Sequence, residues 1–428
     1  MFMQIISGQL LEFTSDPNLG EEEPYTHITK GALVMNEGRI LWRGNSVDLP
    51  AEYKSLPVES YPDCLIMPGF IDAHLHFPQY RMIAAFGKDL LDWLNRYTFI
   101  EEQRYGDEEI AAAAATFFLD ELARNGTTSC LAFSTIHPVA LDALFSEAEK
   151  RNMALISGKT MMDRNAPKGL MDTATSAYDD SKALIAKWAN KGRLGYAVSP
   201  RFAVTSTPAQ LEAAGALFKE HPDTWMQTHL SENHAEIASV AKDFPDAKDY
   251  TDVYDQVGLL GEKALFAHGI HLSERELARL SESGSAIAHC PTSNNFLGSG
   301  LFKYQATHKA NVKIAFGSDI GGGTSYSMLE TMRDAYIVSQ LAGERISAFD
   351  AFYGSTLGNA RVLGLDKQLG TLNTGSYADI IVLDPQATPI MKERHALSQS
   401  IHDVLFALMI MGDDRAIKQT YIAGKPQK

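Results

Sequence analysis

The sequence predicts a closed (β/α)8 barrel, an α/β fold, with a small β-sandwich domain built from both chain termini. Between about Leu65 and Leu365, short apolar runs alternate with segments of helical periodicity. Eight such units within roughly 300 residues are typical of a closed barrel, with an open doubly wound sheet as the alternative. The flanks consist instead of short segments in which apolar and polar residues alternate. The eight apolar runs cover residues 65–76, 127–135, 154–161, 193–200, 224–230, 264–269, 285–291 and 313–319.

Helix start and stop signals lie between these runs, as a barrel requires. Asp107, Thr207 and Ser273 each precede a helical pattern, and their side chains suit the residue that caps a helix N-terminus. Gly126 and Gly284 follow two of these segments, where glycine readily adopts the left-handed conformation that ends a helix. The predicted helices cover residues 107–125, 207–221 and 273–283.

The two ends of the chain predict one small β-sandwich domain. Residues 1–64 and 366–428 contain strand-like segments such as ALVMNEGRILWRG (32–44) and YADIIVLD (377–384). Neither end has enough strands to cover both faces of a sheet, so we expect the two ends to form it together. The barrel domain is then expected to span residues 65–365.

Composition excludes several classes of protein. The chain has 38 Lys and Arg against 53 Asp and Glu, a formal net charge of −15, which disfavours nucleic-acid binding. A hydrophobic content of 45% suits a compact globular chain, and the apolar run Val404–Met411 is too short to span a membrane. Residues 1–14 lack a signal-peptide pattern, and the three cysteines are widely spaced. We therefore expect a cytoplasmic protein with no nucleic-acid or membrane partner.

Two histidines at the end of the first run indicate a metal site. His74 and His76 are separated by one residue, so on a strand both imidazoles project from the same face. His229, His268 and Asp319 lie at the ends of three other predicted strands, and these ends meet at one rim of a barrel. Imidazole and carboxylate groups suit a transition metal, and this set leaves a position for water, as catalytic sites do.

Glu232 lies three residues after His229, just beyond a candidate metal ligand. From there its carboxylate can reach a water molecule beside the metal and act as a general acid and base. The alternative is a carboxylate at the start of a helix, where the helix dipole favours negative charge.

Several longer motifs resemble those of the guanine deaminases in the amidohydrolase superfamily. The histidine pair and AHG (267–269) are general to the superfamily, whereas HFPQY (76–80), LLDWLNRYTF (90–99) and SPRF (199–202) are particular to guanine deaminases. GTLNTGSYADIIVLD (370–384) is similar to the C-terminal signature of the superfamily, so almost the full length is covered. The remaining motifs of the resemblance are QTHLSENHAE (227–236), AHCPTSNNFLGSG (288–300) and GSDIGGGTSYSML (317–329).

The resemblance implies an enzyme that hydrolyses guanine with water to give xanthine and ammonia. It also implies one catalytic zinc ion per chain, held by His74, His76, His229 and Asp319. A homodimer is the expected assembly. The alternatives are a related deaminase that acts on another purine or a pterin, and a non-catalytic scaffold of the same superfamily.

Three residues have catalytic roles by this resemblance. Glu232 moves a proton from the attacking water to N3 of the purine ring, and Asp319 accepts the remaining proton. His268 lies near the metal and its water and steadies the developing tetrahedral oxygen.

Four residues are expected to bind the substrate. The resemblance implies that Gln79 contacts the ring edge, that Arg201 binds the purine carbonyl and that Phe202 contributes beside it. Trp93 is a further candidate. The alternatives are a surface arginine for Arg201 and ordinary core packing for Phe202 and Trp93.

A two-metal site is the main alternative to a single zinc ion. Some relatives bridge two metals with a carbamylated lysine on the fourth strand, but the only tempting strand lysine, Lys159, falls on the third predicted strand. A single metal is therefore favoured. His289 and Cys290, at the end of the seventh strand, are left without an assigned role.

Overall fold

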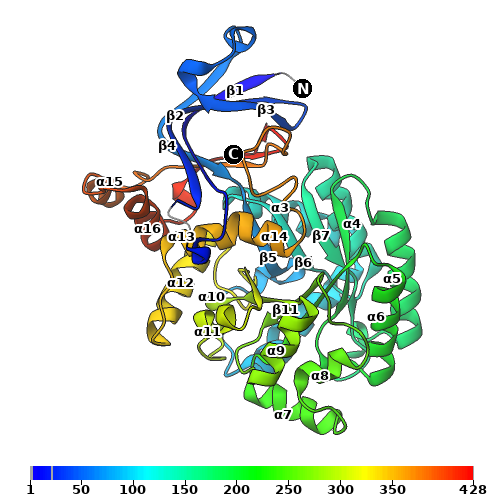
Figure 1. Cartoon of the computed structure of the whole chain (residues 1–428). Helices are drawn as coiled ribbons and strands as arrows, with labels where there is room; N and C mark the ends of the chain where they lie inside the picture. The colour runs from blue at the N-terminus through cyan, green and yellow to red at the C-terminus, as the bar shows by residue number, and fades with distance from the viewer. Residues whose placement is uncertain (1–2, 21–22, 428) are drawn as a thin grey trace.

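The computed structural model describes residues 3–20 and 23–427 and contains the predicted barrel (Figure 1). The barrel strands are β5 (Phe70–His76), β6 (Thr127–Phe133), β7 (Ala154–Gly158), β8 (Thr160–Met161), β9 (Leu194–Pro200), β10 (Trp225–Leu230), β11 (Ala264–His268), β12 (Ala286–His289) and β13 (Lys313–Phe316). Their order in the sheet is β13-β12-β11-β10-β9-β7-β6-β5, with β8 paired to β9 off this path. All of these strand pairs are parallel.

The first and last strands of this path meet, so the barrel closes. The backbone N–H of Asp319, just beyond β13, donates to the carbonyl of His74 at 2.8 Å, and the N–H of His76 donates to the carbonyl of Ile320 at 2.6 Å. Gly317 permits this approach, because a Cβ atom there would lie only 2.8 Å from the Cβ of His74. The open doubly wound sheet is therefore wrong, since its two edge strands would lie apart.

Helices surround the barrel, and the predicted helix caps are confirmed. Three of these helices are α3 (Glu108–Arg124), α6 (Pro208–Glu220) and α9 (Glu274–Ser283). The side chains of Asp107, Thr207 and Ser273 accept hydrogen bonds from backbone N–H groups in their first turns. Gly284 adopts the left-handed conformation, with φ of 74°, where α9 ends. The other helices that follow β6, between barrel strands or directly after the last of them, are α4 (Pro138–Arg151), α5 (Ala174–Trp188), α7 (His234–Asp243), α8 (Tyr250–Asp255), α10 (Pro291–Phe296), α11 (Tyr304–Lys309) and α12 (Met328–Leu341).

The chain between β5 and α3, residues 77–107, is called the β5–α3 segment below. It contains two short helices, α1 (Leu90–Trp93) and α2 (Phe99–Glu102), joined by a π-helical turn over Leu94–Thr98. The remaining helices are α13 (Ala348–Tyr353), α14 (Asn359–Val362), α15 (Pro389–His395) and α16 (Ile401–Met411). No helix in the described part of the chain is long and apolar enough to cross a membrane.

Both ends of the chain build one mixed sheet, which confirms the prediction that the two ends form this β domain together. The strands are β1 (Gln4–Phe13), β2 (Tyr25–Asn36), β3 (Arg39–Asn45), β4 (Val58–Pro68), β14 (Ile380–Leu383), β15 (Ile417–Ile422) and β16 (Lys425–Pro426). Their order is β16-β15-β14-β4-β1-β2-β3, so β4 and β14 join the N-terminal and C-terminal parts. Figure 1 shows the blue N-terminal strands beside the red C-terminal ones at one end of the barrel.

The apolar run at residues 65–76 divides between the two sheets, which corrects the prediction of a single strand. Its first residues belong to β4, where Leu65 to Pro68 pair with β14 in the terminal sheet. The barrel strand begins only at Phe70, after Gly69. Both halves of the run are buried, so hydrophobicity does not mark the passage from one sheet to the other. Gly69 marks this passage, because only a residue without a Cβ atom fits there. A Cβ atom at Gly69 would lie 2.2 Å from the Thr128 hydroxyl oxygen.

The buried core extends from the barrel into the terminal sheet, because the largest apolar cluster also contains residues of that sheet, such as Leu65 and Ile381. The largest apolar cluster joins barrel strands to the surrounding helices, for example through Leu155, Leu119 and Leu144. A smaller cluster, which includes Leu33 and Ile66, lies in the terminal sheet.

A buried ion pair links the barrel to the terminal sheet. Arg193 directly precedes β9, and Asp379 directly precedes β14. Two guanidinium nitrogens of Arg193 contact the two carboxylate oxygens of Asp379, and each side chain is only 4% exposed. The Asp379 carboxylate also accepts the backbone N–H of Ala423 at 2.8 Å.

We expect Asp379→Ala to lower the free energy of unfolding by about 3 to 5 kcal/mol, because the charge of Arg193 stays buried without its partner. Urea denaturation followed by circular dichroism measures the change. Glu149→Ala removes an exposed pair with Lys191, whose side chains are 43% and 48% exposed, and should cost less than about 1 kcal/mol. Equal effects of the two substitutions would contradict a special role for the buried pair.

Candidate metal centre and active-site pocket

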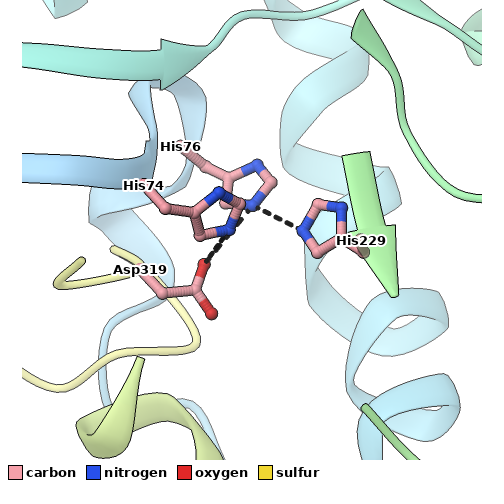
Figure 2. Close-up of side chains that lie close together, drawn as sticks. All are labelled: His74, His76, His229 and Asp319. Atoms are coloured by element: carbon pink, nitrogen blue, oxygen red, sulfur yellow. Dashed lines mark hydrogen bonds and ion pairs between the residues drawn. The ribbon is translucent and has the colours of Figure 1, made fainter. Parts of the chain in front are cut away.

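Four predicted ligands point toward one another at the rim of the barrel (Figure 2). His74 and His76 come from the same face of β5, and His229 comes from β10. Asp319 lies three residues beyond the end of β13, in the loop rather than on the predicted strand. One side-chain nitrogen or oxygen of each residue lies within 4.8 Å of those of the others. The structure therefore brings together the residues that sequence spacing singled out.

The separations between these atoms fit a single metal ion. The Nε2 atoms of His76 and His229 are 3.1 Å apart, and Oδ1 of Asp319 lies 3.3 Å from Nε2 of His74 and 3.4 Å from Nε2 of His76. Ligand atoms about 2.1 Å from one tetrahedral ion would lie about 3.4 Å from each other. Within the described residues, the buried Nε2 of His74 has no hydrogen-bond partner. Three imidazoles and one carboxylate in this arrangement form a metal-binding site.

Hydrogen bonds orient one of these imidazoles for metal binding. Nδ1 of His229 lies 2.7 Å from the backbone carbonyl oxygen of Arg201. Because a carbonyl only accepts hydrogen bonds, Nδ1 carries the ring proton and Nε2 presents its lone pair to the cluster.

Charge in the cluster favours neutral imidazoles around one carboxylate. Burial lowers the pKa of His76 to about 3 and holds the pKa of His229 well below its usual value. Burial alone would raise the pKa of Asp319, but the adjacent imidazoles of His74 and His76 hold it well below its usual value. Neutral imidazole and ionised carboxylate are the forms that coordinate a metal.

Asp72 joins β5 to the loop that carries Asp319, and sequence reasoning missed this residue. Its carboxylate accepts the backbone N–H of Ser318 at 3.0 Å and that of His74 at 3.2 Å, and it also contacts the Ser318 hydroxyl. Burial raises its pKa to about 6. The signal was present, because Asp72, His74 and His76 follow the alternate spacing that places side chains on one face of a strand.

Glu232 and His268 lie beside the metal cluster. Oε2 of Glu232 is 3.3 Å from Nε2 of His268, and that nitrogen is 3.8 Å from Oδ2 of Asp319. The Ser299 hydroxyl donates to Oε1 of Glu232 at 2.8 Å. Burial, with a smaller effect of the Asp319 charge, raises the pKa of Glu232 to about 8. The helix-start alternative does not describe this side chain, because Asn233 caps α7 while Glu232 faces His268.

One pocket unites the metal cluster with the predicted substrate residues. Of the ten predicted site residues, only His74 is absent from its wall, which also contains Leu90, Leu94, Leu297 and Gly322. The predicted residues that line the pocket are His76, Gln79, Trp93, Arg201, Phe202, His229, Glu232, His268 and Asp319.

Arg201 and Gln79 share a partner that sequence reasoning missed. Arg201 is 3% exposed, so the surface-arginine alternative is wrong. Its Nη1 donates to both carboxylate oxygens of Glu102 at 2.9 Å, and Nε2 of Gln79 donates to Oε1 of Glu102 at 2.8 Å. No sequence signal separated Glu102 from its neighbour Glu101, because both are acidic residues at the end of a short helix.

Trp93 and Phe202 belong to the core and also to the pocket wall. Each is 2% exposed and packs in the largest apolar cluster. Both also line the pocket, and the ring of Phe202 lies 6.2 Å from that of His229 with an edge-on geometry. The core and binding interpretations are therefore compatible.

Lys159 lies between β7 and β8 and pairs with Asp172 at 2.5 Å, where both side chains are buried. The fourth large strand, β9, ends at Pro200 without a lysine, so the bridging residue of a two-metal site is absent from this described strand.

Cys290 lies within 4.8 Å of ligand atoms of His268 and Asp319, and burial raises its pKa well above the usual value. His289 stacks on Phe302 at 4.4 Å instead of joining the metal cluster.

We expect His76→Ala to bind less than about a tenth of the metal held by the parent protein, because one of four ligands is removed. Elemental analysis after dialysis measures this. His289→Ala is the control, since it also removes a buried imidazole at a strand end but leaves the four ligands in place. Parent-like metal content in His76→Ala would contradict the assignment.

Comparison with known proteins gives one consistent result. Residues 65–426 match the Amidohydrolase family. The chain is 46% identical over 426 residues to the guanine deaminase of Escherichia coli (strain K12), covering 99% of this chain and 97% of that protein. The structure of E. coli guanine deaminase matches with a TM-score of 0.95 over 99% of both chains. Guanine deaminase from C. acetobutylicum with bound guanine matches with a TM-score of 0.88 at 29% identity, covering 99% of this chain and 100% of that one.

The family match covers the barrel and most of the C-terminal part of the chain. The match to the E. coli protein extends over nearly all of both chains. The expected resemblance is therefore confirmed, and this chain belongs to the amidohydrolase family.

Proposed function

We propose that this protein hydrolyses guanine to xanthine and ammonia. The observation that carries the proposal is one pocket in which the metal cluster and Glu232 face the donor groups of Gln79 and Arg201. Such a pocket can activate water on one side and hold a polar purine edge on the other. The names of the matched E. coli and C. acetobutylicum proteins support the same substrate.

The four-ligand cluster would hold one zinc ion per chain, with His74, His76, His229 and Asp319 as ligands. When bound, zinc lowers the pKa of water to about 7 and so supplies a nucleophile at neutral pH. The donor set supports zinc, because imidazole nitrogen and carboxylate oxygen are among its common ligands. The missing lysine on β9 supports a single ion.

Three side chains would move protons and stabilise charge. Glu232 accepts a proton from the attacking water and donates it to N3 of guanine, so that negative charge does not accumulate on the ring. Asp319 accepts the second proton, and His268 hydrogen-bonds the oxygen that forms on C2. The exocyclic amine takes this second proton from Asp319 and leaves C2 as ammonia. The raised pKa of Glu232, about 8, suits a group that must hold and release a proton near neutral pH.

Arg201 and Gln79 would select the substrate. A guanidinium only donates hydrogen bonds, so it pairs with the O6 carbonyl of guanine but opposes the 6-amino group of adenine. Adenine also has no amine at C2 to leave. Phe202 and Trp93 supply apolar pocket wall beside these polar groups.

A screen for ammonia release separates this function from the alternatives. Guanine, adenine, 8-oxoguanine, cytosine and dihydroorotate are assayed side by side, with ring-opening of dihydroorotate followed separately. Selective release from guanine supports the proposal. A preference for another purine would favour the related-deaminase alternative, and an inactive protein without stoichiometric metal would favour a scaffold.

We expect Glu232→Gln to have a turnover number about 10²- to 10⁴-fold lower than that of the parent and an unchanged zinc content. An amide has a shape similar to that of the carboxyl group but cannot transfer the proton. Steady-state kinetics and elemental analysis measure the two properties. Turnover close to that of the parent would mean that another group moves the proton.

We expect Arg201→Ala to lower kcat/KM for guanine by about tenfold or more without loss of zinc, since the residue lies outside the metal ligands. Its partner Glu102 then stays buried without a counter-charge, so thermal unfolding is measured in parallel. Unchanged guanine turnover, or equal parent activity on adenine, would contradict this pocket assignment.

Three further predictions about the whole protein stay proposals. We retain a homodimer, a cytoplasmic location and a division into a barrel domain, predicted as 65–365, and a terminal β domain, predicted as 1–64 with 366–428. The pairing of Leu65–Pro68 with β14 moves the first boundary to the region of Gly69. The three cysteines are buried and free, as a reducing compartment favours. Light scattering after size-exclusion chromatography tests the dimer.

A further inference from the structure

Glu102 is the last residue of α2 and lies in the β5–α3 segment. Its side chain is fully buried, at 0% exposed. Gln79 and Arg201 belong to the lining of the pocket, whereas Glu102 does not. The carboxylate therefore acts on the pocket through the two side chains that it contacts.

The contacts of Glu102 determine which way the Gln79 amide points. The Gln79 group that lies 2.8 Å from the Glu102 carboxylate must be the NH2, because an ionised carboxylate only accepts hydrogen bonds. The amide oxygen then accepts the backbone N–H of Gly321 at 3.2 Å. One N–H and one lone pair of the amide stay available for a ligand.

The same carboxylate holds Arg201 in a defined orientation. Nη1 donates to both carboxylate oxygens of Glu102, at 2.9 Å from each. The ring of Phe99, on the same short helix, lies 5.6 Å from the guanidinium carbon. Among the described residues, no partner of Nε or Nη2 of Arg201 is present, so these donors are available on the pocket side.

We propose that Glu102 is a positioning residue that sets the donor pattern of the substrate pocket by holding Gln79 and Arg201 together. The proposal rests on the proposed function, because these two residues must bind the purine. With Glu102 in place, the pocket directs N–H groups toward the acceptor edge of an oxopurine. Without it, the guanidinium loses its buried counter-charge, and the Gln79 amide is held only by the Gly321 N–H.

Only a carboxylate can satisfy both partners at once. If Gln replaced Glu102 with its oxygen at the Oε1 position, its NH2 would face Nη1 of Arg201, which is also a donor. In the opposite orientation, the NH2 would face both the Gln79 amide nitrogen and Nη1 of Arg201. Gln79 could relieve this clash only by flipping, and its own NH2 would then face the Gly321 N–H. In every arrangement, therefore, one buried N–H donor faces another donor instead of an acceptor.

The test compares guanine with 2-aminopurine, which keeps the C2 amine but has no oxygen at C6. We expect Glu102→Gln in the zinc-loaded enzyme to lower kcat/KM for guanine about 100-fold, as misplaced binding groups do. The advantage of guanine over 2-aminopurine should shrink by at least about tenfold, because the affected contacts are those to the C6 oxygen. 2-Aminopurine is also measured as a competitive inhibitor, so its affinity is known whether or not it reacts.

Controls separate positioning from a structural role. Glu101→Gln changes the adjacent residue of α2, whose carboxylate pairs with Arg81 at 2.9 Å near the surface, and should keep parent kinetics. Glu102→Asp keeps the charge on a side chain shorter by one methylene, and should retain more guanine selectivity than Glu102→Gln. It also provides the same comparison if Glu102→Gln does not fold. Zinc content and melting temperature are recorded for every variant.

Two results would overturn the proposal. One is a guanine kcat/KM within about threefold of the parent. The other is an equal loss for guanine and 2-aminopurine, since a residue that only stabilises the fold or the metal centre would affect both substrates alike. Guanine turnover by the parent enzyme tests the proposed function separately, because the Glu102 effect is measured as a ratio between variant and parent.

Discussion

Closure of the barrel between β5 and the loop after β13 is the constraint on which the metal centre depends. His74 and His76 lie on β5 and Asp319 lies beyond β13, so these ligands meet only because the two ends of the sheet meet. The Asp319 N–H bonded to the His74 carbonyl fixes their spacing directly. Asp72 adds a second connection through Ser318. Backbone and buried side chain thus hold the ligands before any ion binds, which limits the reorganisation that binding requires.

Burial of charge is the second feature of the site. Carboxylates with little access to water are costly unless a partner compensates them. The structure uses a different partner for each: imidazoles for Asp319, a hydroxyl for Glu232 and a guanidinium for Glu102. Burial, with a smaller effect of the Asp319 charge, raises the pKa of Glu232, and the hydrogen bond from the neutral Ser299 hydroxyl offsets this only in part. One pocket therefore contains an ionised ligand and a carboxyl able to carry a proton, which is the separation that acid–base catalysis needs.

The β5–α3 segment connects the metal cluster with the side chains proposed to recognise the substrate. It contributes Trp93 and Leu90 to the pocket wall, and Glu102 and Phe99 contact Arg201 from the same segment. Arg201 in turn accepts the His229 ring proton through its backbone carbonyl. The residue proposed to bind the purine carbonyl thereby also orients one imidazole of the metal cluster.

Local patterns in the sequence determined the elements of the fold. Asp107, Thr207 and Ser273 predicted helix starts correctly because capping depends on bonds within one turn. Strand alternation likewise placed His74 and His76 on one face. The boundary at Gly69 was missed, because both halves of that run are buried and look alike in hydrophobicity.

The sequence by itself therefore determined the barrel, the helix caps and the set of candidate ligands, since each depends on neighbouring residues or on strand order. Only the tertiary structure decided that Glu102, rather than Glu101, holds Gln79 and Arg201. It also decided that Asp72 ties the closing strands together. These roles depend on which side chains meet after the chain closes on itself, and residues 99 positions apart in sequence, such as Glu102 and Arg201, carry no local signal of that contact.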